Sequence, residues 1–379
     1  MSKPLAPRSP RAALEPERVP QPGRHSRRVR HPAVVAGNAF FMFLVLILIA
    51  GGGALFLGKQ RFEAPGPLPQ DKVVEIPRGL GTRGISDLLV RQGVIDEPYV
   101  FIGGVIARRA RGELKHGEYK FRAHASIADV VETMIEGKVV RHLLTIPEGL
   151  TSEQVVAKLL SDDALEGPIK GIPAEGTLLP ETYQFTHGMT REQMIRRMQE
   201  QDKRVVAEVW QHRSPDLPLK TPEELVTLAS IVEKETGRPD ERSRVAAVFI
   251  NRLRRNMRLQ SDPTIIYGLT GGNGSLGHPL RKNEMEQPNP YNTYLIDGLP
   301  PGPIANPGRA SLDAVANPAR TKDLYFVADG NGGHVFSETY QQHMKNVARL
   351  RAIEKARASA AASSPTGGDK ADAPKAETP

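Results

Sequence analysis

The segment TPEELVTLASIVEKET, which runs from Thr221 to Thr236, predicts a helix with one buried face. Thr221 and Glu224 match a capping box, and Pro222 occupies the first helical position, where proline is favoured. At 100° per residue, the apolar side chains of this helix gather in one arc around Ala229. Glu233 falls at about +40° from Ala229, inside that arc. The sequence therefore places a carboxylate on the buried face of the helix.

Two interpretations of Glu233 follow from this position. A carboxylate that loses hydration has a raised pKa, so Glu233 is expected to hold a proton near neutral pH and to serve as a general acid. The alternative is a structural ion pair with an arginine of the following helix, namely Arg242, Arg244 or Arg252. Glu235 lies about 200° from Glu233, so these two carboxylates cannot form a dyad on one helix face.

The chain around this helix is expected to contain further helices and one hairpin. Residues 190–256 are helix-rich, whereas the chain from Leu259 to about Phe336 is dense in Pro, Gly, Asn and Tyr. The segment LYFVADGNGGHVF, from Leu324 to Phe336, predicts two strands around a glycine-rich turn. A last helix is expected from Glu338 to Ala358, and the Ala-, Ser- and Pro-rich residues 359–379 are expected to be disordered.

A sequence repeat with an offset of 70 residues lies upstream. VEIPRGL (Val74 to Leu80) matches LTIPEGL (Leu144 to Leu150), and an amphipathic helical pattern follows each copy. Each copy predicts a short strand, a Pro–Gly turn and a helix. We expect these two strand–turn–helix units to form a small α/β module.

Residues Ala33 to Gly58 have the properties of a transmembrane helix. They carry no charge, and Asn38 is their single polar side chain. At 1.5 Å per residue this stretch exceeds the roughly 30 Å of a bilayer core. A cleavable signal peptide is the less favoured alternative, because the preceding basic region is too long and no A-x-A cleavage site follows.

The charge distribution predicts the orientation of this helix. Residues 1–32 contain two acidic residues and eight basic ones: Lys3, Arg8, Arg11, Arg18, Arg24, Arg27, Arg28 and Arg30. Only Lys59 and Arg61 follow the apolar stretch closely. The positive-inside rule therefore predicts a cytoplasmic N-terminus and export of the chain after residue 60. The Pro/Gly-rich stretch that follows is expected to be a tether.

Composition excludes several classes of function. The 51 Lys and Arg residues exceed the 43 Asp and Glu residues by 8, and the basic tail accounts for 6 of this excess. The rest of the chain is close to neutral, so no nucleic-acid partner is expected. The chain has no cysteine, which excludes disulfides and thiolate chemistry. The histidines show no metal-ligand spacing, so neither a metal nor another cofactor is implied.

Several motifs together resemble the MltG (YceG-like) endolytic murein transglycosylases. The resemblance covers about half of the exported part, in the family's order, and is highly specific. The matching stretches are EGTLLPETY (Glu175 to Tyr183), LASIVEKET (Leu228 to Thr236), VFINRL (Val248 to Leu253), MRLQSDPTIIYG (Met257 to Gly268), YNTYLIDGLPPGPIANPG (Tyr291 to Gly308) and LYFVADGNGGHVFS (Leu324 to Ser337).

This resemblance implies an α+β fold behind a single-pass anchor, with a LysM-like α/β subdomain before a helix-rich catalytic domain that has short strands. The expected boundaries are a basic cytoplasmic tail at 1–32, a transmembrane helix at 33–58, a linker at 59–72, the LysM-like subdomain at 73–170, the YceG-like catalytic domain at 171–358 and a disordered tail at 359–379.

The resemblance also implies a reaction. The family's catalytic glutamate falls on Glu233, and the implied reaction cleaves the β-1,4 bond between N-acetylmuramic acid and N-acetylglucosamine of nascent peptidoglycan, leaving a 1,6-anhydro end. The implied location is the bacterial inner membrane with a periplasmic catalytic domain, and a peptidoglycan synthase complex is an implied partner. Polar motif positions are expected to contact the glycan: Gln260, Asp262, Tyr291, Asn292 and Tyr294.

Two alternatives stay open at this point. One is a muramidase-type hydrolase that uses Glu233 with Asp262 as its second carboxylate. The other is a glycan-binding envelope protein without catalysis, in which Glu233 is a member of a structural ion pair. The products would separate the two enzymes, because hydrolysis leaves a reducing end and transglycosylation an anhydro end.

Overall fold

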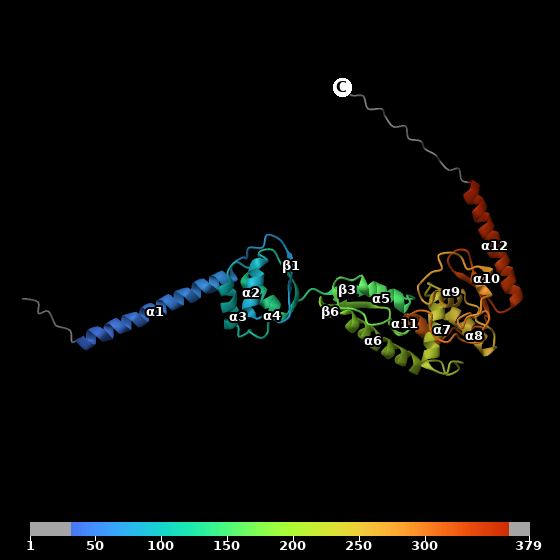
Figure 1. The fold of residues 1–379 in the computed structure, drawn as a ribbon, viewed down its shortest axis with the longest axis horizontal. Helices are drawn as coiled ribbons and strands as arrows, with labels where there is room; N and C mark the ends of the chain where they lie inside the picture. Colours follow the sequence, from blue (N-terminus) through green and yellow to red (C-terminus); the bar gives the residue numbers. More distant parts are fainter. Residues whose placement is uncertain (1–31, 364–379) are drawn as a thin grey trace, which may run out of the picture.

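The structure is a computed structural model that describes residues 32–363. Helices and short two-stranded sheets alternate along these residues, so the fold is a mixture of helix and strand. α1 (Pro32–Glu63) projects as a rod from a first module, and two further packed regions follow along the long axis (Figure 1). Residues 1–31 of the expected basic tail and residues 364–379 of the expected C-terminal tail lie outside the described residues.

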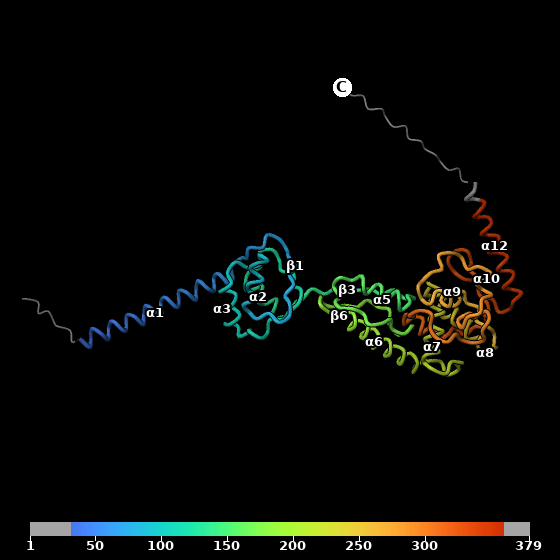
Figure 2. The backbone as a smooth tube through the Cα atoms, in the orientation of Figure 1, coloured from blue at the N-terminus to red at the C-terminus, as the bar shows by residue number. Residues whose placement is uncertain are grey.

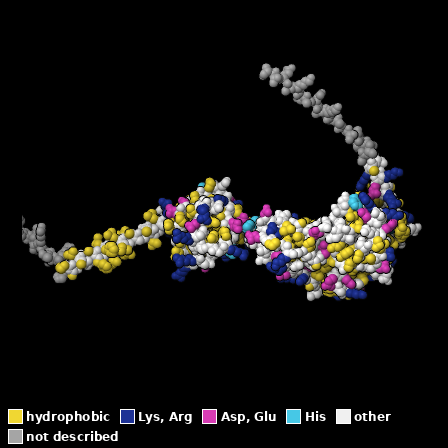
Figure 3. Space-filling model, in the orientation of Figure 1, with side chains coloured by type: hydrophobic (Ala, Val, Ile, Leu, Met, Phe, Trp, Pro, Cys, Tyr) yellow, Lys and Arg dark blue, Asp and Glu magenta, His cyan; other side chains and the backbone are white. Residues whose placement is uncertain are grey.

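α1 is long and apolar enough to cross a membrane, with a mean hydropathy of 2.6 in its most apolar window and none of that window buried. Apolar side chains cover the rod on the face shown in Figure 3. This helix agrees with the expected single-pass anchor. It runs on to Glu63 and so includes the first residues of the expected linker.

The rest of the expected linker is packed rather than free. The Gly66 N–H donates to the His124 carbonyl at 3.2 Å, and the His124 N–H donates to the Leu68 carbonyl at 2.9 Å. Leu68 is buried, with 3% of its surface exposed. The stretch is held because one apolar side chain and two backbone hydrogen bonds anchor it to the first module. The expectation of a tether at 59–72 is therefore corrected.

The first module contains a two-stranded antiparallel sheet packed against helices. Its hydrophobic core includes the fully buried residues Leu89, Phe101, Tyr119 and Val131. The chain passes once from this module to the next region (Figure 2). The elements are β1 (Lys72–Ile76), α2 (Thr82–Arg91), α3 (Pro98–Ala107), β2 (Gly117–Phe121) and α4 (Ile127–Glu136), and β1 pairs with β2.

The second copy of the repeat belongs to the next region. Its strand β3 pairs antiparallel with β5, which lies beyond residue 170. A separate core joins Leu144 and Leu159 of the repeat to Tyr183 and Met198. The expected boundary at 170 therefore falls inside one packed core. The elements are β3 (His142–Thr145), α5 (Ser152–Leu160), β4 (Leu165–Glu166), β5 (Thr182–Phe185), β6 (Met189–Thr190) and α6 (Arg191–Gln211).

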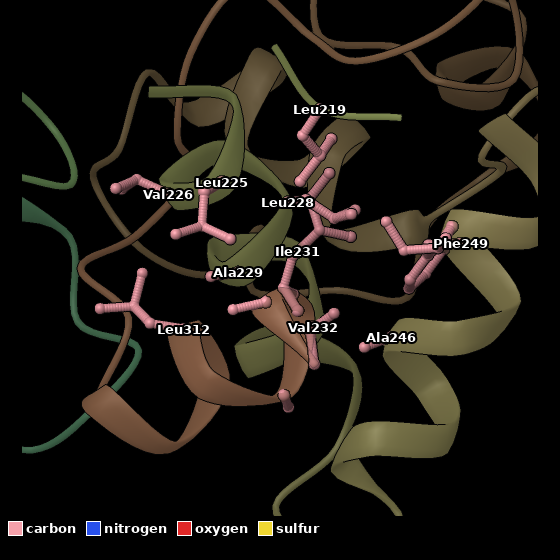
Figure 4. Packing of buried hydrophobic residues seen from close by; sticks show 14 of the residues in the cluster. Leu219, Leu225, Val226, Leu228, Ala229, Ile231, Val232, Ala246, Phe249 and Leu312 are labelled. Carbon is pink, nitrogen blue, oxygen red and sulfur yellow. The ribbon is translucent and has the colours of Figure 1, made fainter. Parts of the chain in front are cut away.

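The third region packs around α7 (Pro222–Glu235), which forms where the sequence predicts a helix, although its burial is not confined to the predicted face. Leu225 to Val232 are eight consecutive buried residues, and Figure 4 shows apolar side chains among them, such as Leu225 and Val232, in one cluster with Leu312 and Phe249 of neighbouring helices. The Thr221 hydroxyl caps α7 by accepting from the Glu224 N–H at 3.3 Å. The other elements are α8 (Arg242–Arg254), α9 (Asp262–Thr270), α10 (Lys282–Met285), α11 (Arg309–Ala316), β7 (Tyr325–Ala328), β8 (His334–Ser337) and α12 (Tyr340–Ser363).

Two expectations for the C-terminal part have different outcomes. The hairpin is confirmed, because β7 pairs antiparallel with β8. The last helix, α12, runs to Ser363, so residues 359–363 of the expected disordered tail are helical. The alanines of this stretch favour helix propagation, which explains the extension.

Candidate active site

Glu233 lies in the last turn of α7, where four chain segments meet. Its carboxyl group accepts a hydrogen bond from the Gly308 N–H at 2.9 Å and lies 3.5 Å from Nη2 of Arg242. Its side chain is 5% exposed. The carboxyl group is therefore oriented by two donors that belong to other elements, the N-terminal ends of α11 and α8.

Arg242 is the arginine that the structural interpretation of Glu233 required. Arg244 instead pairs with Asp323 at 2.7 Å, and Arg252 donates to the Leu324 carbonyl at 2.7 Å. Arg242 also lies 3.6 Å from Glu148, which occupies the turn after β3. The ion pair with Glu233 thus exists, but it includes a second carboxylate.

Two glycines allow the four segments to approach this closely. Gly149 has φ of +75°, and a Cβ there would contact Cγ of Glu233 at 3.5 Å. A Cβ on Gly308 would overlap the carboxyl group of Glu148. Glycine is therefore required at 149 by its left-handed backbone and at 308 by the nearby carboxyl group.

Asn306 ties the segment that carries Gly308 to the turn that carries Glu148. Its backbone carbonyl accepts from the Gly149 N–H at 3.0 Å, and its backbone N–H donates to the Leu150 carbonyl at 2.9 Å. Its buried amide side chain donates to Glu175 at 3.1 Å and accepts from the Leu178 N–H at 3.0 Å. One asparagine thereby fixes the backbone on two sides of Glu233.

Glu175 belongs to a polar cluster next to Asn306. It accepts from the Ser152 N–H at 2.8 Å, and burial raises its pKa despite this hydrogen bond. The rings of Tyr267 and Tyr291 lie 4.9 Å apart beside it. Burial, followed by the negative charge of Glu175, raises the pKa of both tyrosines. The cluster therefore combines a carboxyl group with two neutral phenols.

Glu235 faces a different set of partners. The Ser261 hydroxyl donates to its carboxyl group at 2.5 Å, and the Tyr294 hydroxyl donates to neighbouring Asp262 at 2.7 Å. Burial raises the pKa of Glu235 to about 7, against the effect of the Ser261 hydrogen bond. The two carboxylates of the helix end thus lie in separate clusters, as their angular separation predicts.

The raised pKa of Glu235 predicts a pH dependence of stability. An unfolded glutamate loses its proton near pH 4.5, whereas folded Glu235 keeps it to about pH 7. Between these values the folded state binds more protons, so stability falls as the pH rises, by up to about 1.4 kcal/mol per pH unit. We expect the melting temperature to fall more steeply from pH 5 to pH 8 in the wild type than in Glu235→Gln. Parallel curves would contradict this.

Comparison with known proteins identifies the family of the chain. The model of the YceG-like family matches residues 74–349, which include every residue of the site described above. The chain belongs to the YceG-like family.

Individual YceG-like relatives are similar over most of the chain. An endolytic murein transglycosylase of Bacillus subtilis (strain 168) is 30% identical over 331 residues, covering 78% of this chain and 89% of the relative. A relative of the same name from Streptococcus pneumoniae (strain D39) is 28% identical over 356 residues, covering 81% of this chain and 64% of its own length. A 2.6 Å crystal structure of a yceG-like protein from Listeria monocytogenes is 31% identical, with a TM-score of 0.45, and covers 73% of this chain and 99% of that one.

The structure distributes the expected glycan-contacting residues of this YceG-like chain over two places. Asp262 and Tyr294 lie beside Glu235. Gln260, two positions before Asp262 in the chain, is exposed and has a φ of +51°. Tyr291 lies beside Glu175. Contact of these four residues with glycan stays a prediction.

Asn292 has a different environment from the other four residues. It is completely buried, and its amide donates to the Met285 and Gln287 carbonyls at 2.9 and 3.0 Å. These bonds close the loop from inside. We therefore correct the expectation of direct glycan contact for Asn292.

Sequence reasoning missed four residues that build the site: Glu148, Glu175, Arg242 as a partner of two carboxylates, and Asn306. Glu148 and Glu175 lie within quoted motifs, so their identity was visible. Their proximity to Glu233 was not, because it depends on turns that bring distant segments together. The sequence offered one signal for Glu148: the repeated turn carries a glutamate in its second copy where its first copy carries Arg78.

Proposed function

We propose that this protein is an endolytic peptidoglycan lytic transglycosylase with Glu233 as its acid and base. Membership of the YceG-like family makes it an enzyme of the lyase class, with peptidoglycan as its substrate. The finer proposal is cleavage of the β-1,4 bond between N-acetylmuramic acid and N-acetylglucosamine with formation of a 1,6-anhydro end. The observation that carries it is the buried carboxyl group of Glu233, oriented by the Gly308 N–H and Arg242.

One carboxyl group can serve both steps of this reaction. Glu233 first donates its proton to the glycosidic oxygen, and the bond to the muramic acid C1 breaks. The resulting carboxylate then accepts the proton of the muramic acid 6-hydroxyl, whose oxygen bonds to C1. No water is consumed. A hydrolase would need a second carboxylate that activates water or attacks C1.

The placement of Asp262 supports the lyase over the hydrolase. The Asp262 carboxylate accepts from Tyr294 and interacts with Glu235 rather than with Glu233. A hydrolase that uses Glu233 with Asp262 would need both carboxyl groups on one scissile bond. The non-catalytic alternative is supported only by the ion pair between Arg242 and Glu233. That ion pair fits a catalytic role equally well, because it can orient a catalytic carboxyl group.

The anchor supports action near the membrane. α1 is the apolar helix at the start of the described residues, and with the expected cytoplasmic N-terminus the site would lie on the outer side of the bacterial inner membrane. New glycan strands emerge there, so internal cleavage would end strand elongation. Proximity to a peptidoglycan synthase complex follows from the same placement.

The first module supports a contact with glycan. Its strands β1 and β2 pair antiparallel beside α2 and α3, and the family resemblance implies a LysM-like subdomain in this part of the chain. We propose that it holds the strand while Glu233 cleaves it. This role leaves the chemistry to the regions that follow.

The mass of newly formed glycan ends tests the proposed function. Full-length protein in detergent is incubated with isolated glycan strands, and the products are measured by mass spectrometry. We expect anhydro-muramic ends, lighter than reducing ends by one water, on fragments cut from strand interiors. Reducing ends would favour the hydrolase, and unchanged strands would favour the binding protein.

A further inference from the structure

Glu148 is a second carboxylate within reach of Glu233. The two carboxyl groups lie within hydrogen-bonding range of each other. Nη2 of Arg242 lies 3.6 Å from Oε2 of Glu148 and 3.5 Å from Oε1 of Glu233, so one guanidinium group faces both. The side chain of Glu148 is 43% exposed, whereas that of Glu233 is 5% exposed. Glu148 is therefore the more solvent-exposed carboxylate of the two.

The fold of the turn does not require glutamate at position 148. The first copy of the repeat has exposed Arg78 at the equivalent place. Both turns use a glycine in the left-handed region at the next position, with φ of +85° at Gly79 and +75° at Gly149. The same turn thus accepts either charge. Only the copy that faces the end of α7 carries a carboxylate.

The surroundings of the pair hold fewer positive charges than negative ones. Arg242 is the cation that contacts both carboxylates, and Lys234 donates to the Gly149 carbonyl at 3.2 Å. Glu181 adds a more distant negative charge to Glu148. With Glu148 and Glu233 both ionised, the site would keep two adjacent carboxylates for one shared guanidinium group.

One proton between the two carboxyl groups resolves this repulsion. It makes the cluster of Arg242, Glu148 and Glu233 neutral and provides the donor that a carboxyl–carboxyl hydrogen bond requires. Burial, followed by the charge of Glu233, raises the pKa of Glu148, in the direction expected for such a pair. Two coupled carboxyl groups titrate as a unit rather than separately.

We propose that Glu148 is a positioning residue that shares the catalytic proton with Glu233. The inference rests on the proposed function. The pair holds one proton, and Glu148 carries the negative charge at the moment when Glu233 presents that proton to the glycosidic oxygen. After that donation, the charge of Glu148 favours the return of a proton to Glu233 from the muramic acid 6-hydroxyl.

The pH dependence of cleavage tests this role. Full-length Glu148→Gln in detergent is compared with the wild type, with kcat/KM measured on isolated glycan strands from pH 4.5 to 9. Without Glu148, Glu233 no longer shares a proton with a second carboxyl group, so the alkaline limb of the pH profile is expected to move about one pH unit lower. Cleavage would fall about tenfold on that limb and stay within about threefold of the wild type at pH 5.

Two further variants separate charge from structure. Glu148→Asp keeps the charge on a shorter side chain, so its alkaline limb is expected between those of the wild type and Glu148→Gln. Glu153→Gln removes a charge from neighbouring α5 and is expected to leave the profile unchanged. Melting temperatures identify any variant that is not folded.

The outcomes distinguish this inference from the proposed function. If kcat/KM of Glu148→Gln falls at the same alkaline pH as that of the wild type, whatever the overall rate, the role of Glu148 is overturned. The proposed function would still stand if Glu233→Gln were inactive. Full cleavage by Glu233→Gln would overturn the proposed function itself, whatever the profile of Glu148→Gln.

Discussion

Glu233→Gln is expected to lower the rate of glycan cleavage by about a thousandfold while the protein stays folded. The amide has nearly the shape of the carboxyl group and can still accept from the Gly308 N–H, but it can neither donate nor accept the transferred proton. General acid–base catalysis contributes about 10² to 10⁴ in rate, and Glu233 serves in both steps. Initial rates of strand cleavage measure the loss, and circular dichroism checks the fold.

Two variants of the same helix sharpen this test. Glu223→Gln removes an exposed carboxylate from the first turn of α7 and is expected to cleave at the wild-type rate. Glu235→Gln asks whether the other carboxylate of the helix end is the acid, and we expect it to keep at least a tenth of the activity. Loss of activity in Glu235→Gln together with full activity in Glu233→Gln would assign the chemistry to Glu235.

Asn306→Ala is expected to lower the free energy of unfolding by about 3 kcal/mol. The change removes the acceptor of the buried Leu178 N–H and a donor to the half-buried carboxyl group of Glu175. A buried polar group left without its partner costs about 1–3 kcal/mol. Cleavage should also fall, because Asn306 holds the segment that presents the Gly308 N–H to Glu233. Thermal unfolding is expected to shift down by about 10 °C.

Asn317→Ala is the matched control for this variant. Asn317 is exposed and donates one hydrogen bond of 3.3 Å, to the His212 carbonyl. Its removal should cost less than about 1 kcal/mol and leave cleavage unchanged. Equal melting temperatures for the two variants would show that the Asn306 hydrogen bonds contribute little.

Local sequence patterns predicted the elements that carry the site. The capping residues and apolar arc predicted α7 and the opposite directions of Glu233 and Glu235, which contact Gly308 and Ser261 respectively. The repeated IPxGL turn predicted two strand–turn–helix units. These predictions succeed because capping, helical periodicity and glycine turns depend on neighbouring residues.

The sequence could not predict how the elements assemble. The two repeat copies form sheets with different partners, β2 and β5, because strand pairing is decided by residues far along the chain. The contact of Glu148 with Glu233 depends on the same assembly. The linker was predicted to be free, but it is packed. Its Pro/Gly-rich composition suggested a tether, yet its single leucine, Leu68, is buried.

The predicted glycan contacts show a similar limit. Asn292 and Tyr294 are two positions apart in one motif, but one closes the loop from inside and the other donates to Asp262. Polarity alone does not distinguish these roles, because both side chains can bind either sugar or backbone. Telling a loop-closing residue from a surface residue requires knowing which side chains are buried, and the motif alone does not show this.

Cleavage in heavy-oxygen water tests the central claim most directly. Glycan strands are incubated briefly with wild-type protein or Glu233→Gln in water enriched in oxygen-18, and the new ends are weighed. We predict that wild-type ends are anhydro-muramic and carry no heavy oxygen, because the 6-hydroxyl of the sugar is the attacking group, and that Glu233→Gln forms no new ends. Heavy oxygen at C1 of the new wild-type ends would show that water attacks, which would contradict the mechanism.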